Sequence, residues 1–272
     1  MFRRAVAITV DGSCPRFISG YRCFLMDSSS KTDSASNASA DSATGGGKQL
    51  TVFQAGRVPY DEAFDVQQTL ARNMAETGSD GSGILILLEH PPVITIGRRG
   101  SEGNVVASPA VLEREGVQVR EVNRGGDVTY HGPGQIVGYP IVNLREYGSD
   151  VHEHMRRLER VLIGTLADYG IAGWQQAGYT GVWVEDRKIA SIGIAVSRWI
   201  AYHGFALNVN PNLDHFKLIV PCGLQDVRMT SMALEADMPV DAHEVRNRIV
   251  AHFRNEFEFE SVETLQGMPL SP

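Results

Sequence analysis

Three segments of the chain carry apolar residues at helical spacing. The first is Pro59–Ala75, whose proline suits the first turn of a helix. The other two open at Asp150 and Asp241, each followed three residues later by a glutamate, the pattern of a capping box, and the Asp150 helix is expected to run to Gly170. On the first helix the stripe is Tyr60, Phe64, Gln67, Ala71 and Met74, apolar except for Gln67. On the second it is Val151, Met155, Leu158, Leu162 and Leu166, and on the third it includes Val245, Ile249, Phe253 and Phe257.

Shorter apolar or alternating runs between these helices predict strands. They are Leu50–Gln54, Ile84–Leu88, Val93–Ile96, Val117–Val122, Gly181–Glu185, Lys188–Val196 and Trp199–Val209. Asp186-Arg187 is expected to form a two-residue hairpin turn, and Ser108 to cap a brief helix. Together the elements predict an α+β fold, a mixed and largely antiparallel sheet with flanking helices.

The N-terminal part of the chain differs from the rest in composition. Residues 27–48 are almost entirely small and polar, so they bury too little apolar surface to offset the entropy of ordering. Residues 1–26 are too short to fold alone, and Met26 is an alternative initiator. Ala5–Val10 is shorter than the apolar core of a signal peptide. We therefore expect residues 1–48 to be a disordered extension and residues 49–272 to form the folded domain.

Charge and cysteine content narrow the class of protein. A net charge of −7 argues against nucleic-acid binding, and no apolar run is long enough to span a membrane. Cys14, Cys23 and Cys222 form neither a disulfide framework nor a zinc pattern. These features favour a reducing compartment and predict a cytoplasmic protein without a metal or cofactor.

The segment Arg124-Gly-Gly-Asp-Val-Thr-Tyr-His-Gly-Pro-Gly-Gln135 is the most informative part of the chain. Four glycines and a proline among polar side chains predict a shaped loop, because glycine permits positive φ and close backbone approach while proline fixes φ. Such loops on a rigid scaffold commonly hold ligands, although two ordinary turns in a β-rich region are the alternative.

Two side chains outside this segment are candidates for nucleophilic chemistry. Cys222 lies between Pro221 and Gly223, where a sharp turn would expose its thiol, although a lone cysteine is also compatible with simple packing. Lys188 opens a predicted strand, and alternation directs it to the face opposite Arg187. An ammonium near a thiol favours the thiolate, and the free amine can accept the thiol proton.

The histidines offer weaker signals. His131 and His203 are site candidates, although a lone histidine is more often structural. His152 and His154 are two residues apart on a predicted helix, so they do not share a face, and a metal site there is not expected.

Taken together, several blocks resemble the lipoyl(octanoyl) transferase family. Besides residues 124–135, they are Gly181-Val-Trp-Val184, Lys188-Ile-Ala-Ser-Ile-Gly193, His203-Gly-Phe-Ala-Leu-Asn208, Pro221-Cys-Gly223 and Thr230-Ser231. They occur in family order over about residues 50–257, whereas residues 1–48 match nothing in the family. The resemblance implies a fold similar to the catalytic domain of biotin and lipoate ligases.

The resemblance also implies a reaction. Octanoyl-acyl carrier protein would donate an octanoyl group to a lysine of lipoyl-carrier domains, those of 2-oxoacid dehydrogenases and the glycine cleavage H protein, as the first step of endogenous protein lipoylation. Cys222 would carry the acyl thioester and Lys188 would activate it. The residues implied to bind substrate are Arg124, Gly125, Gly126, Asp127, Val128, Thr129, Tyr130, His131, Ser191, Ile192, Gly193, Gly204, Phe205 and Ala206.

Such a reaction places physical requirements on the site. An octanoyl chain needs an apolar slot, for which Ile192, Ile194, Phe205 and Leu207 are the expected walls. Backbone N–H groups at glycines 125, 126, 193 and 204 are expected to face the thioester oxygen. Docking of an acidic carrier protein requires a local positive face. The candidates for that face are Arg98, Arg99 and Arg124, or Arg156, Arg157 and Arg160.

Three other classes remain open on the sequence. A lipoate-protein ligase would activate a free acid with ATP and need no nucleophilic cysteine. A non-catalytic acyl-binding module would use Cys222 only for packing. A thioester hydrolase would need a positioned water, and no side chain is clearly assigned to that task.

Overall fold

A computed structural model describes residues 47–220 and 227–269 of the chain. The predicted disordered extension, residues 1–48, lies outside this part except for its last two residues, so its disorder stays a prediction. Lys48 already belongs to the folded part, since its carbonyl oxygen accepts a hydrogen bond from the Glu260 N–H at 2.8 Å. None of the helices within the described residues is both long and apolar enough to cross a membrane.

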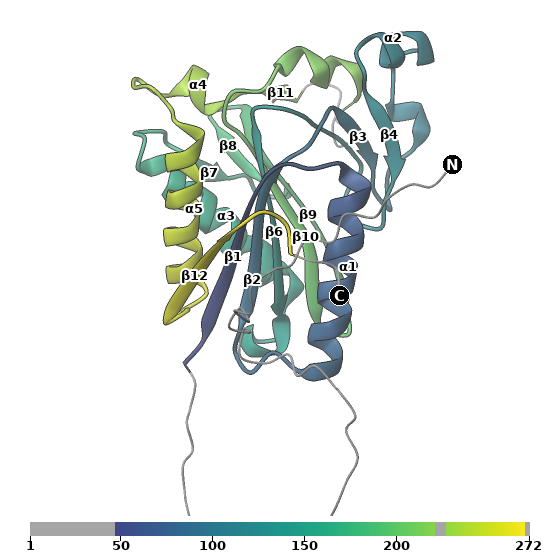
Figure 1. Cartoon of the computed structure of the whole chain (residues 1–272). Helices are drawn as coiled ribbons and strands as arrows, with labels where there is room; N and C mark the ends of the chain where they lie inside the picture. Colours follow the sequence, from purple (N-terminus) through teal and green to yellow (C-terminus); the bar gives the residue numbers. More distant parts are fainter. Residues whose placement is uncertain (1–46, 221–226, 270–272) are drawn as a thin grey trace, which may run out of the picture. The chain divides into compact units, whose positions relative to one another are not determined.

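The main sheet is mixed and largely antiparallel, as predicted. Its strands run in the order β12-β1-β2-β6-β10-β9-β8-β7, with β11 paired to β9 (Figure 1). The strands are β1 (Gln49–Arg57), β2 (Gly83–Glu89), β6 (Gln135–Asn143), β7 (Trp174–Gln175), β8 (Val182–Val184), β9 (Arg187–Ser197), β10 (Ile200–Asn208), β11 (Arg228–Met229) and β12 (Ser261–Gln266). β1 pairs in parallel with both β12 and β2, whereas β6, β10, β9 and β8 form antiparallel pairs.

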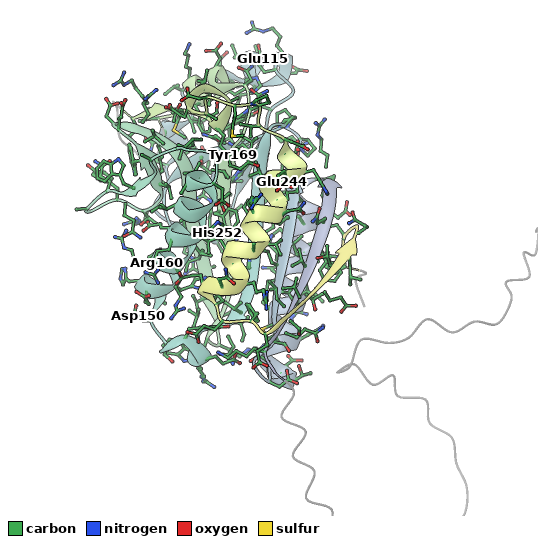
Figure 2. All side chains as sticks on the ribbon, turned by 90° about the vertical axis from the view of Figure 1, so that its left-hand side faces the viewer. Glu115, Asp150, Arg160, Tyr169, Glu244 and His252 are labelled. Carbon is green, nitrogen blue, oxygen red and sulfur yellow. The ribbon has the colours of Figure 1, made fainter. Side chains whose placement is uncertain are left out.

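Helices cover both faces of this sheet. α1 (Tyr60–Thr77) packs its apolar stripe on one face, against β2, β6 and β10. α3 (Val151–Ala167) and α5 (Ala242–Glu256) cover the other face and lie next to each other (Figure 2). The N-cap positions predicted at Asp150 and Asp241 are confirmed, because their carboxylates accept backbone N–H groups of the first turns. α3 ends at Ala167 and not at Gly170 as predicted. Pro59 lies at the N-cap of α1 and not within its first turn.

A smaller sheet lies beside the main one in the order β4-β3-β5. It consists of β3 (Val93–Ile96), β4 (Gln118–Glu121) and β5 (Val128–His131), accompanied by α2 (Pro109–Arg114) and the 3₁₀ helix η3 (Leu213–Leu218). Its apolar core is separate from the two cores of the main sheet and includes Ile94, Tyr130 and Phe216. The remaining short elements are η1 (Glu102–Asn104), η2 (Leu144–Tyr147) and α4 (Met232–Glu235).

Two further predictions, both about turns, were wrong. The β8–β9 hairpin turns at Glu185-Asp186 and not at Asp186-Arg187, since Val184 pairs with Arg187 and Glu185 has φ of +52°. The glycine-rich segment 124–135 is not one continuous loop, because it contains the strand β5 between two turns. Backbone pairing of β5 with β3 overrides the turn propensity of the flanking glycines.

Candidate active site

A cavity of about 900 Å³ opens where the middle of β9 is left uncovered. The strand is buried at Lys188–Ala190 and at Ile194–Ala195, but residues 191–193 between them are half-buried. The walls come from β9, β10, the 124–131 segment, the first turns of α3 and residues 178–180. Its size is typical of small-molecule sites.

Most residues implied by the family resemblance line this cavity. They are Arg124, Gly125, Gly126, Asp127, Val128, Thr129, His131, Lys188, Ser191, Ile192, Gly193, Gly204, Phe205 and Ala206. Tyr130 lies elsewhere: it is buried in the core of the smaller sheet, and its hydroxyl is 2.6 Å from Nδ1 of His215. Cys222 lies outside the described residues.

Lys188 is a buried lysine on the cavity wall, only 4% exposed. Its Nζ lies 5.6 Å from the centroid of the Trp183 ring, and its backbone pairs with Trp183 on one side and Met229 on the other. Arg187 points away from the cavity and forms ion pairs with Glu185 and Glu235. The predicted alternation of the two residues is therefore confirmed.

Arg124 holds the glycine-rich segment against β3. It is 8% exposed, and its guanidinium donates to the carbonyl and hydroxyl oxygens of Thr95 at 2.7 Å each. It also donates to the carbonyl oxygens of Gly125 and Asp127 at 3.0 and 2.9 Å. Because most of its hydrogen-bonding capacity is directed inward, Arg124 shapes the cavity and does not extend the exposed positive face predicted for it.

Aromatic and imidazole side chains form another wall, which the sequence analysis largely missed. Tyr60 of α1 stacks on His131 at 6.5 Å. His90 is fully buried and lies outside the cavity lining, and its ring meets that of His131 edge-on at 5.9 Å. Nε2 of His90 lies 2.7 Å from the Tyr139 hydroxyl. Tyr60 was predicted only as part of a helical stripe, and nothing in the spacing of His90 or Tyr139 indicates a shared site, because strand pairing brings them together.

Burial keeps this wall uncharged near neutral pH. Burial lowers the pKa of the neighbouring His90 to about 4. Burial, together with the nearby charges of Arg124 and Arg98, lowers the pKa of His203 to about 3. Burial also lowers the pKa of His131 well below its usual value and raises the pKa values of the Tyr60 and Tyr139 hydroxyls. The cavity therefore combines neutral polar groups on this wall with arginines at its edge.

Apolar side chains also line the cavity. Ile192, Ile194 and Phe205 lie there as expected, but Leu207 is buried in the main core and does not reach it. Val151 and Met155 of α3 add apolar surface that sequence reasoning did not assign. This mixture suits a ligand with an apolar tail and a polar head.

Of the four glycine N–H groups expected to face the thioester oxygen, the structure contradicts the one at Gly125, and the others stay a prediction. The Gly125 N–H donates to the Ile194 carbonyl oxygen at 2.8 Å, so it is already used within the protein. Gly193 and Gly204 face each other in the β9–β10 ladder. These glycines instead permit close packing: a Cβ at Gly204 would lie 2.2 Å from the Gly138 oxygen.

The chain on either side of residues 221–226 is attached to cavity residues. Before the gap, the Val220 N–H donates to the Asn104 carbonyl oxygen, and the Asn104 side-chain amide donates to both carboxylate oxygens of Asp127 at 3.0 and 2.8 Å. After the gap, Met229 pairs with Lys188, and the Thr230 N–H donates to the Lys188 carbonyl oxygen at 2.9 Å. The chain before residue 221 is thus attached through Asn104 to the glycine-rich segment, and the chain after residue 226 is attached to Lys188.

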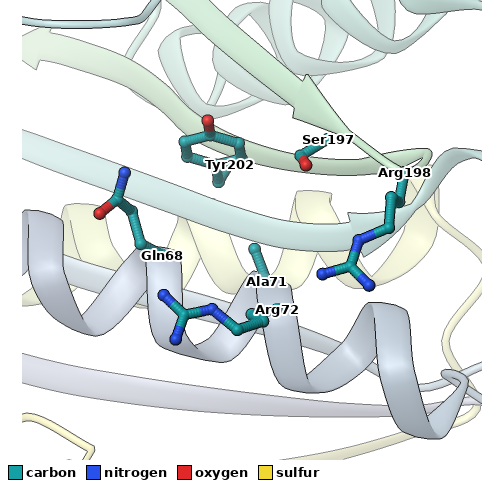
Figure 3. Close-up of a pocket in the computed structure, with 6 residues that line it drawn as sticks. All are labelled: Gln68, Ala71, Arg72, Ser197, Arg198 and Tyr202. Atoms are coloured by element: carbon teal, nitrogen blue, oxygen red, sulfur yellow. The ribbon is translucent and has the colours of Figure 1, made fainter.

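A smaller pocket of about 170 Å³ lies between α1 and the β9–β10 hairpin (Figure 3). Its lining includes Arg72, Arg198 and Tyr202. The Tyr202 hydroxyl accepts a hydrogen bond from Asn123, whose side-chain oxygen lies 2.8 Å from Nε2 of His203. Asn123 and His203 therefore connect this pocket's wall to that of the large cavity.

The fold and its cavity define a catalytic domain of the lipoate-ligase type. Residues 59–254 match the lipoyl protein ligase A/B catalytic domain family. Among solved structures, a bipartite lipoate protein ligase from Thermoplasma acidophilum aligns with a TM-score of 0.64 and 15% identity, covering 82% of this chain and 88% of that one. Lipoate-protein ligase A bound with ATP aligns with a TM-score of 0.63 and 16% identity over 79% and 89% of the two chains. The predicted likeness to lipoate ligases is confirmed.

Curated relatives narrow the class further. The octanoyltransferase of Solibacter usitatus is 48% identical over 208 residues, covering 76% of this chain and 92% of that protein. The octanoyltransferase of Alkaliphilus metalliredigens is 45% identical over 218 residues, covering 80% and 99%. The chain belongs to the lipoyl(octanoyl) transferase family.

Proposed function

We propose that this protein transfers an octanoyl group from octanoyl-acyl carrier protein to a lysine of lipoyl-carrier domains, through a thioester on Cys222. The observation that carries the proposal is Lys188, a buried lysine on the wall of a cavity lined by the family's motif residues. The apolar part of the cavity suits an eight-carbon chain. Curated relatives of this protein are octanoyltransferases.

The reaction divides into two acyl transfers. In the first, the Cys222 sulfur attacks the donor's thioester carbonyl, the new C–S bond replaces the old one, and the carrier thiol leaves with the proton lost by Cys222. In the second, the acceptor lysine amine attacks the same carbonyl, an amide forms, and the Cys222 thiol is regenerated with the proton lost by the amine. Two steps through a thioester allow the two protein substrates to bind in turn.

Lys188 would serve both steps. As an ammonium it favours the Cys222 thiolate, and as a free amine it accepts a proton from the thiol or from the incoming lysine. The attachment of both flanks of residues 221–226 to Asp127 and Lys188 supports a common site for these groups.

Intact mass spectrometry after incubation with octanoyl-acyl carrier protein tests the proposal. The wild type should gain one hydroxylamine-labile octanoyl adduct without ATP, Cys222→Ser should gain none, and Lys188→Ala should gain it slowly. A Cys14→Ser/Cys23→Ser variant is the matched control and should react as the wild type does. An adduct that persists in Cys222→Ser contradicts the proposal.

The alternatives predict other outcomes of the same experiment. A ligase would attach free octanoate only with ATP and independently of Cys222. A binding module would take up ligand without any covalent adduct, and a hydrolase would release octanoate without an acceptor. The acceptor step is tested by adding a lipoyl domain of a 2-oxoacid dehydrogenase or the glycine cleavage H protein and following transfer of the label. A cytoplasmic location stays a prediction.

A further inference from the structure

Glu159 of α3 is a fully buried carboxylate outside the lining of the large cavity. One of its oxygens accepts from Nη1 of Arg156 at 2.5 Å, and the other accepts from the backbone N–H of Gly181 at 2.9 Å. A buried carboxylate is tolerated when it has a charge partner and hydrogen-bond donors, and these two residues supply both. Glu159 therefore connects α3 to the chain just before β8.

Gly181 in turn lies against the end of the Lys188 side chain. Its φ is +124°, and a Cβ built on it would lie 2.7 Å from Cε and 3.3 Å from Nζ of Lys188. The Trp183 ring approaches the same Nζ at 5.6 Å. The position of the Gly181 backbone thus decides how much room the lysine's terminal atoms have.

We propose that Glu159 is a positioning residue for Lys188, acting through Gly181. By holding the Gly181 N–H, the carboxylate fixes the backbone that confines the ammonium. Arg156, which lies on the cavity wall, neutralises the carboxylate. The proposal rests on the proposed function, since it assigns Glu159 a part in the reaction through Lys188.

A double-mutant cycle separates this role from a general contribution to folding. The single-turnover rate of octanoyl adduct formation is measured for the wild type, Glu159→Ala, Lys188→Ala and the double variant. Glu159→Ala should slow adduct formation on the order of 100-fold, the cost of misplacing a reacting group by about 1 Å. In the Lys188→Ala background the same change should alter the rate less than about twofold, because the group it positions is gone. A full additional loss in the double variant overturns the proposal.

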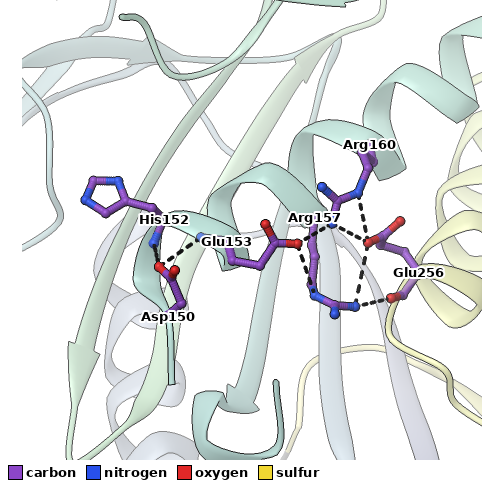
Figure 4. A network of polar contacts seen from close by, with 6 residues as sticks. All are labelled: Asp150, His152, Glu153, Arg157, Arg160 and Glu256. Carbon is purple, nitrogen blue, oxygen red and sulfur yellow. Dashed lines mark hydrogen bonds and ion pairs between the residues drawn. The ribbon is translucent and has the colours of Figure 1, made fainter. Parts of the chain in front are cut away.

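Conservative replacement and a matched control sharpen the test. Glu159→Gln keeps a side-chain oxygen for the Gly181 N–H and should retain the rate within about tenfold of the wild type, so a Gln variant as slow as the Ala variant overturns the proposal. Glu153→Ala removes a partly exposed glutamate of the same helix, which pairs with Arg157 and Arg160 (Figure 4), and should leave the rate unchanged.

The experiment distinguishes a folding defect from a failure of the proposed function and from a failure of the proposed role of Glu159. If Glu159→Ala does not fold, as judged by thermal unfolding, Glu159→Asp takes its place in the cycle with Lys188→Ala, because it keeps the charge but shortens the side chain that reaches the Gly181 N–H. The expectation and the contradicting result stay the same. If the wild type forms no adduct, or if Lys188→Ala reacts at the wild-type rate, the proposed function fails. If both behave as expected and the cycle is additive, only the role of Glu159 fails.

Discussion

At the scale of single residues, the cavity depends on side chains whose polar groups are directed into the protein. Arg124 shows this most clearly. Its guanidinium donates hydrogen bonds to Thr95 on β3 and to two carbonyl oxygens of its own segment. This single planar group therefore fixes the turn to the neighbouring strand, which an apolar side chain could not do. Lysine has the same charge but cannot reach these acceptors together.

Arg124→Lys should therefore destabilise the protein by about 3 kcal/mol, since buried carbonyl oxygens lose charged donors. Chemical denaturation measures the change. Arg114→Lys, at an exposed arginine of α2, is the control and should shift the midpoint little. Equal, small shifts in both variants would show that the inward hydrogen bonds of Arg124 contribute nothing.

Gly181→Ala should destabilise the protein more than an alanine replacement at another glycine with positive φ. Its Cβ would meet the Ala190 carbonyl oxygen at 2.5 Å, in addition to the backbone strain of about 1–3 kcal/mol that a side chain brings at such φ values. Gly170→Ala is the matched control, because its φ is +72° and a Cβ there meets nothing within 4 Å. Thermal unfolding compares the two variants. Equal losses of melting temperature would contradict the prediction, because they would show that the backbone near Gly181 shifts to accommodate the Cβ without further loss of stability.

At the scale of elements, local signals predicted what local chemistry controls. The apolar stripes and capping aspartates predicted α1, α3 and α5, because each signal acts within a few residues of itself. The turn between β8 and β9 was misplaced by one residue, since neither glycine nor asparagine marks its positions. β12 was missed because its pairing with β1 joins segments about 200 residues apart, which no local pattern records.

The burial of His154, where α3 packs on the C-terminal part of the chain, should make the stability of the protein depend on pH. His154 is 1% exposed, its ring meets Phe257 edge-on, and within the described residues neither ring nitrogen has a hydrogen-bond partner. Burial lowers its pKa to about 4. Between about pH 6.5 and 4 the unfolded chain therefore binds a proton that the native imidazole does not.

His154→Leu should remove this term. As the pH falls from 6.5 towards 4, the wild type should lose stability relative to the variant, by up to about 1.4 kcal/mol for each pH unit. Above pH 7 the two should differ by a constant amount. Urea denaturation across this range provides the measurement, and parallel curves for the two proteins would contradict the assignment.

At the scale of the whole molecule, the cavity is assembled from segments that are distant in sequence. The motif resemblance predicted most of its lining, because each motif is local and together they imply one site. Periodicity predicted which face Lys188 occupies and placed Tyr60, Val151 and Met155 on helical stripes, but it did not indicate that these residues share a cavity. The contributions of Tyr60, Tyr139 and Met155 follow from how α1, β6 and α3 meet around β9 and β10, and such contacts become visible only once the elements are placed.

The proposed acidic donor would approach the exposed arginines at the edge of the cavity. Arg98 and Arg99 both line it and are exposed, whereas Arg157 and Arg160 of the other candidate face are paired with Glu153 and Glu256. Charged faces mainly raise the rate of encounter, and salt screens that effect.

Changing Arg98 and Arg99 together to Glu should lower kcat/KM for the acyl carrier protein at low salt and flatten its decline with added salt. The rate with a small octanoyl thioester should stay as it is in the wild type. Arg57→Glu/Arg114→Glu makes the same change of charge at exposed positions outside the cavity lining. An unaltered salt dependence in the Arg98/Arg99 variant would assign docking to another surface.

The parallel pairing of β1 with β12 also governs when the sheet can be completed during synthesis. β1 is the first strand that the structure describes and β12 the last, yet Gln49 and Ser261 are direct neighbours. Until residues 261–266 have left the ribosome, one row of backbone N–H and C=O groups on β1 has no partner strand. The edge of the sheet beside β1 closes only after residues 261–266 have been synthesised, so a chain truncated just before Ser261 would leave this strand edge able to pair with other chains.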